Sequence, residues 1–179
     1  MRDLIERFVA WLRRLRFSVP AGRRMAHANL RSEVLHVDPA TLRIPENQPW
    51  GHAWCVLMET GLRGGVASLI VVADGTVSFY TGTGGGTIGA GASLVAAGAA
   101  DRFLEVAGDV AGRLDPAAGF LLPKVGHVRF QVRSGVGDGT ADAPEDVLRR
   151  GRHLLSPLYF AGQDVLTEIR LLEEERKKD

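Results

Sequence analysis

The pattern of hydrophobic residues in the middle of the chain predicts a group of antiparallel β-strands. Residues 52–60 are apolar on both faces, which indicates a central strand, and residues 66–73 form a second buried strand. Asp74-Gly75 predicts a two-residue turn, because both positions accept a positive φ. Residues 76–81 then return as a third strand, so the folded body begins with a sheet.

The second half of the chain mixes helical and strand periodicity. Apolar residues recur at helical spacing over residues 92–114, and Ser156-Pro157 begins a C-terminal helix. Residues 125–133 alternate as a fourth strand, in which Val128, Phe130 and Val132 face inward and His127, Arg129, Gln131 and Arg133 face outward. We expect a glycine-rich turn at 134–140 and a short helix at 144–150. The fold class is therefore α+β, with a mainly antiparallel sheet of four or more strands packed by two long helices.

The N-terminal segment has a different character from the body. Residues 3–17 are predicted to form an amphipathic helix whose apolar stripe is a candidate partner-binding surface: Leu4, Ile5, Phe8, Trp11, Leu12 and Leu15. Three prolines follow between residues 38 and 50. We divide the chain into a basic helical arm (1–37), a proline-rich connection (38–50) and an α+β domain (51–175).

Charge and composition indicate where the protein is located and what its N-terminal arm could contact. The chain has 179 residues and a net charge of +1, yet residues 1–31 hold eight arginines against two acidic residues. Charges interrupt the N-terminal apolar residues, so no signal peptide is predicted, and the single Cys55 excludes an internal disulfide framework. We expect a cytoplasmic protein without a cofactor. Its arm has three alternatives: docking on its own sheet, packing on a partner or second copy, or lying on an anionic membrane surface.

The glycine-rich segment 82–91 is the most conspicuous motif. Gly84, Gly86 and Gly89 satisfy G-x-G-x-x-G, but the preceding strand is the return arm of a hairpin rather than the first strand of a βαβ unit. Dinucleotide binding is therefore not predicted. A connection that needs positive φ is the simpler interpretation, and an anion or phosphate site at the start of the next helix is the alternative. The candidate ligand residues are Gly84, Gly85, Gly86, Thr87 and Tyr80.

Other candidate groups are isolated. His52 and Cys55 lie three positions apart on a strand, so their side chains point to opposite faces and do not form a nucleophile–base pair. His127, Arg129 and Arg133 share one strand face and could contact an anion. No metal site is predicted, because the histidines are scattered and only one cysteine is present.

Two segments resemble a family of uncharacterised bacterial proteins. They are Ser-Phe-Tyr-Thr at 78–81, continuing to Gly-Gly-Gly-Thr-Ile-Gly at 84–89, and Leu-Ser-Pro-Leu-Tyr-Phe-Ala-Gly at 155–162, continuing to Ile169-Arg170. The resemblance covers about residues 52–172 and implies no activity or site residue. More loosely, the arrangement is similar to roadblock, longin and profilin-like modules, which act as binding and dimerisation platforms, although the element order departs from the roadblock pattern.

These observations favour a non-catalytic protein-interaction or assembly module. Its N-terminal amphipathic helix would provide the contact with a protein partner or a second copy, and we expect no nucleic-acid partner. The alternative function is a small-molecule or phosphate-binding protein, possibly an enzyme, that uses the 82–91 loop at a helix N-terminus.

Overall fold

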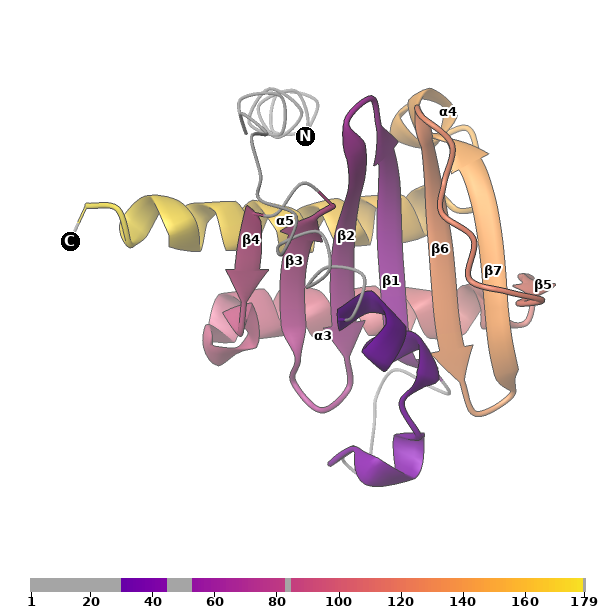
Figure 1. Ribbon diagram of the computed structural model, residues 1–179, viewed down its shortest axis with the longest axis horizontal. Helices are drawn as coiled ribbons and strands as arrows, with labels where there is room; N and C mark the ends of the chain where they lie inside the picture. Colours follow the sequence, from indigo (N-terminus) through magenta and orange to yellow (C-terminus); the bar gives the residue numbers. More distant parts are fainter. Residues whose placement is uncertain (1–29, 45–52, 83–84, 179) are drawn as a thin grey trace.

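A computed structural model describes residues 30–44, 53–82 and 85–178. It confirms the α+β class: a seven-stranded antiparallel sheet has the order β4-β3-β2-β1-β6-β7-β5 (Figure 1). The three predicted opening strands are β1 (Ala53–Leu62), β2 (Gly65–Val72) and β3 (Val77–Thr81). β1 is the middle strand, as expected for a strand whose residues are buried on both faces.

The fourth predicted strand is β6 (His127–Ser134), and it pairs with β1 on one side and β7 (Gly137–Pro144) on the other. The expected turn at 134–140 was too long, because residues 137–140 already belong to β7. That strand reads Gly-Asp-Gly-Thr-Ala-Asp-Ala-Pro and has no apolar run. It is held by backbone pairing to β6, which a search for hydrophobic periodicity does not detect. The two-residue β5 (Asp115–Pro116) completes the sheet beside β7.

The glycine-rich segment was expected as a loop, and this expectation was wrong for residues 85–88. They form β4 (Gly85–Ile88), which pairs with β3 at one end of the sheet. Gly86 has φ +156°, and a Cβ atom at this position would lie only 2.1 Å from the carbonyl oxygen of Phe79. Close contact between the two strands therefore explains this glycine. A short 3-10 helix, η2 (Ala90–Ala92), then leads to the first long helix.

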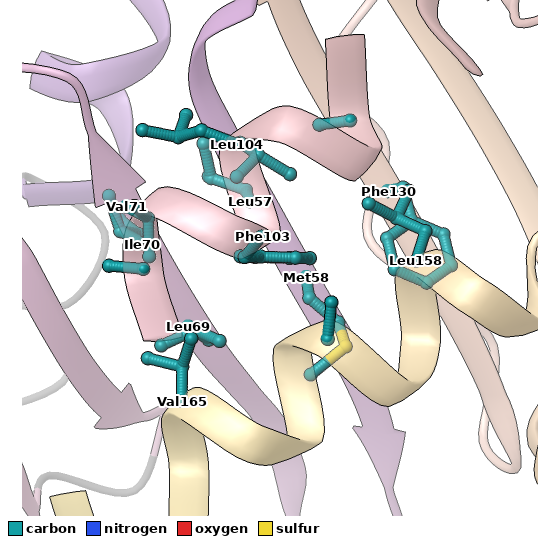
Figure 2. Packing of buried hydrophobic residues seen from close by; sticks show 14 of the residues in the cluster. Leu57, Met58, Leu69, Ile70, Val71, Phe103, Leu104, Phe130, Leu158 and Val165 are labelled. Atoms are coloured by element: carbon teal, nitrogen blue, oxygen red, sulfur yellow. The ribbon is translucent and has the colours of Figure 1, made fainter. Parts of the chain in front are cut away.

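Two long helices cover one face of the sheet, as predicted. They are α3 (Leu94–Ala111) and α5 (Ser156–Glu175), with the short α4 (Glu145–Arg149) between them in sequence. Met58 and Leu69 of the sheet lie against Phe103 of α3 and Val165 of α5 in the apolar core (Figure 2). No helix among the described residues is long and apolar enough to cross a membrane.

α5 packs closely on the sheet because Gly162 has no side chain. A Cβ atom there would lie 2.7 Å from the sulfur of Met58 and 3.2 Å from the ring of Phe103. The helix backbone thus approaches β1 at the centre of the core, where a larger residue would push the two layers apart.

On the other face of the sheet, residues 30–36 lie in front of β1 in Figure 1, and the rest of the segment 30–44 continues beyond the lower end of that strand. Residues 30–36 are helical, and the 3-10 helix η1 (Pro39–Thr41) follows. Leu35 is buried in the core. Part of the segment that the sequence assigns to the arm therefore packs against the domain, while the predicted helix at 3–17 lies outside the described residues.

Candidate functional site

A buried ion pair joins the N-terminal segment to the central strand. Glu59 of β1 is 0% exposed, and Arg31 contacts it with both ends of its guanidinium: Nε donates to Oε1 and Nη2 donates to Oε2, each at 2.7 Å. Ser68 of β2 donates its hydroxyl to Oε1 at 3.0 Å. Arg31 Nη2 also donates to the carbonyl of Phe120 at 2.9 Å. One carboxylate thus links three separate segments of the chain.

The sheet register explains why Glu59 meets these partners. Glu59 lies opposite Ser68 on β2 and opposite Arg129 on β6, so all three belong to the face covered by residues 30–44. A buried carboxylate is costly unless it is paired, and a bidentate arginine with an added hydroxyl donor provides that pairing. Since both oxygens are occupied by donors, the arrangement suits a role in joining segments.

Arg133 forms a second link between the same two parts. From β6 its Nη1 donates to the carbonyls of Val37 at 2.7 Å and Val34 at 3.3 Å, at the end of the helical residues 30–36. A cation at the C-terminal end of a helix is favourable, because carbonyl groups there lack helical partners. The guanidinium also lies 4.3 Å from the ring centroid of Trp54, where β1 has a bulge.

The outward-facing residues of β6 are covered instead of solvated. Gln131 is 1% exposed, and within the described structure neither its amide nitrogen nor its amide oxygen has a hydrogen-bond partner. Nε of Arg129 is also buried without a partner, whereas its Nη2 donates to Asp142 at 3.3 Å. This outward face is covered because the helical residues 30–36 and the segment between β5 and β6 lie over the sheet here (Figure 1).

The predicted anion-binding face of β6 carries matched charges. Nδ1 of His127 lies 2.6 Å from Oδ1 of Asp142, which Arg129 also contacts. Arg133 donates to Asp138 at 3.2 Å. Both aspartates belong to β7, so the positive charges of β6 have acidic partners on the neighbouring strand.

The predicted ligand residues of the glycine-rich segment are partly brought together. Tyr80 on β3 lies opposite Gly86 on β4, and Gly85 and Thr87 are the neighbours of Gly86 along β4. They do not lie at the helix N-terminus, since α3 begins only at Leu94. The hydroxyl of Thr87 donates to the carboxylate of Glu173 on α5. Tyr80 is buried, and this burial raises the pKa of its hydroxyl.

Several predicted residues lie outside the described structure. These are Gly84, His52 and the whole apolar stripe of the N-terminal helix: Leu4, Ile5, Phe8, Trp11, Leu12 and Leu15. Cys55 is described and fully buried in β1, and burial raises the pKa of its thiol to about 12. The thiol is therefore protonated at neutral pH and is a poor nucleophile.

Sequence reasoning missed the Arg31–Glu59 pair. The available signal was Glu59 itself, a single carboxylate inside a strand that is apolar on both faces. Such a group requires a buried cation, and the arginine-rich arm was one source of it.

Among residues 30–44, 53–82 and 85–178, no three His, Cys, Asp or Glu side chains gather as a metal site would require. A comparison of the chain with protein-family models, curated proteins and solved structures finds no match.

Proposed function

We propose that the protein is a non-catalytic interaction or assembly module whose contact surface includes the apolar stripe of its N-terminal amphipathic helix. The observation that carries this proposal is the attachment of the following segment to the sheet. Arg31 is bound by the buried Glu59, and Arg133 is bound to the carbonyls of Val34 and Val37.

This attachment supports the proposal because it holds the segment that follows the predicted N-terminal helix on the sheet. Residue 30 enters the described structure one position before Arg31, whose guanidinium has three hydrogen bonds in the protein interior. A partner bound to residues 3–17 would be connected to this segment, and through it to β1 and β6, by residues 18–29. An amphipathic helix that packs its apolar stripe on a partner is a common mode of recognition.

The experiment compares two double variants of the full-length chain. Phe8→Gln with Leu12→Gln removes apolar contacts from the stripe without changing charge, and we expect loss of partner capture and of any change in mass measured by light scattering. Arg7→Gln with Arg14→Gln removes charge off the stripe and serves as the matched control. Should the arginine variant lose binding while the stripe variant keeps it, the contact is electrostatic and this proposal fails.

A further inference from the structure

The two ends of the sheet differ in how they are protected. At one end, β5 has only two residues, one of them Pro116, and the adjacent β7 carries Asp138, Asp142 and Pro144. Short strands, prolines and charges are the usual features that prevent an edge strand from pairing with another chain. At the other end, β4 reads Gly-Gly-Thr-Ile and contains neither a charge nor a proline. Alternate residues of an edge strand direct their N–H and C=O groups away from the sheet.

Large hydrophobic side chains are exposed on β4 and at the start of α3. Ile88 on β4 is 67% exposed, and Leu94 and Val95 at the start of α3 are 90% and 64% exposed. All three lie in a stretch, residues 75–100, that has no charged side chain although a quarter of the whole chain is charged. Because Thr87 contacts Glu173 of α5, the adjacent Ile88 points to the other face of the sheet, so hydrophobic side chains are exposed on both faces around this uncharged stretch.

The end of α5 adds a pattern of charge. Thr87 on β4 contacts Glu173, and from there α5 continues past the edge of the sheet (Figure 1). The helix ends with three acidic side chains, Glu173 to Glu175, and three basic ones, Arg176 to Lys178, follow it; residues 174–178 are exposed. When two such segments lie antiparallel, the acidic triplet of each faces the basic triplet of the other.

We infer that β4 is a self-association edge, on which the β4 strands of two copies of this chain pair antiparallel about a two-fold axis. This inference rests on the assembly function proposed above and names a second copy as the partner. Antiparallel pairing of identical strands is compatible with a two-fold axis, and the uncharged edge brings no like charges together. The charge order of residues 173–178 is self-complementary in the same arrangement. Because the opposite edge is protected, assembly stops at two copies.

The test measures the mass of the full-length protein by sedimentation equilibrium over a range of concentrations. Ile88→Lys places two like charges near the axis and should raise the dissociation midpoint of the dimer by roughly tenfold or more. Val136→Lys is the matched control: Val136 is 66% exposed in the turn between β6 and β7, and this variant should associate like the wild type. A monomeric wild type, or an Ile88→Lys protein that dimerises like the wild type, overturns the inference.

A charge exchange tests the antiparallel arrangement separately. Glu175→Lys and Arg176→Glu should each weaken the dimer, and the two together should restore it, since Glu175 of one copy faces Arg176 of the other and the exchanged pattern is again self-complementary. A double variant no stronger than the singles overturns this arrangement. If Phe8→Gln with Leu12→Gln abolishes partner capture while Ile88→Lys dimerises normally, the assembly function stands and the β4 edge fails. The reverse result keeps the edge and removes the N-terminal contact.

Discussion

The two faces of the central sheet are held in different ways. The face under α3 and α5 is packed with apolar side chains such as Met58, Leu69 and Phe103, which contact many neighbours (Figure 2). The face under residues 30–44 combines the packing of apolar side chains such as Leu35 with directed polar contacts, above all those of Arg31 with Glu59. Apolar packing is spread over many weak contacts, whereas a buried ion pair concentrates a large energy in one place.

This difference predicts different responses to substitution. On the apolar face, substitutions that keep the side-chain volume should cost little stability, and substitutions that add volume should be destabilising. The polar face should be sensitive to the loss of one charge but tolerant of the loss of both partners. Substitutions that separate these behaviours test the comparison directly.

The largest effect is expected from Arg31→Ala. It leaves Glu59 charged and buried without its main partner, which should lower the free energy of unfolding by about 3–5 kcal/mol in urea titrations. Replacing both Arg31 and Glu59 with methionine should recover most of that loss. Arg102→Ala is the control, since Arg102 and Glu105 form an exposed pair on α3 and such pairs contribute less than about 1 kcal/mol. If the methionine pair is no more stable than Arg31→Ala, the polar face is not held as described.

A smaller effect is expected from Gly162→Ala on the apolar face. The added methyl group meets the Met58 sulfur and the Phe103 ring, and overpacking should lower the free energy of unfolding by about 1–3 kcal/mol. Gly98→Ala makes the same change within α3, where a Cβ atom has open space, and should stabilise the protein by roughly 0.5–1 kcal/mol. Chemical denaturation of both variants should give shifts of opposite sign; a shared sign would contradict the close packing of α5.

Gln131→Met should stabilise the protein by about 1 kcal/mol. The native amide is buried without a hydrogen-bond partner among the described residues, and an apolar side chain of similar length avoids that desolvation. Thermal unfolding monitored by circular dichroism measures the gain. Gln131→Glu, which buries a charge at the same position, should destabilise the protein. A destabilised Gln131→Met variant would mean that the amide has an unseen bonding role.

The smallest effect on stability at ordinary pH is expected from the ionisation of two buried tyrosine hydroxyls. Tyr80 lies on the polar face and Tyr159 lies on α5, and for both the leading cause is burial, which raises the pKa of the hydroxyl above its usual value of 10. A raised folded pKa means that the stability contribution is complete below pH 10 and declines above it. Ultraviolet titration should therefore show tyrosinate appearing only together with unfolding. Tyrosinate in a still folded protein near pH 10 would contradict the burial of these side chains.

The sequence predicted most of the sheet and both long helices, because their hydrophobic periodicity is strong. It missed β4 and β7, which contain glycine, threonine and aspartate and are held by backbone pairing to β3 and β6. It placed Gln131 on the outward face of β6 without showing that this face is buried, since alternation along one strand does not reveal a further layer over the sheet. The Arg31–Glu59 pair joins residues that are 28 positions apart in the sequence. A local sequence pattern carries no information about contacts at that separation.

The position of Cys55 has a consequence for following the dynamics of the fold. It is the single cysteine of the chain, and it is fully buried in β1 between β2 and β6. A thiol reagent can reach it only when the sheet opens at its middle. The rate of labelling therefore reports the opening of the central strands, and comparison of that rate with global unfolding would show whether the core opens as one unit.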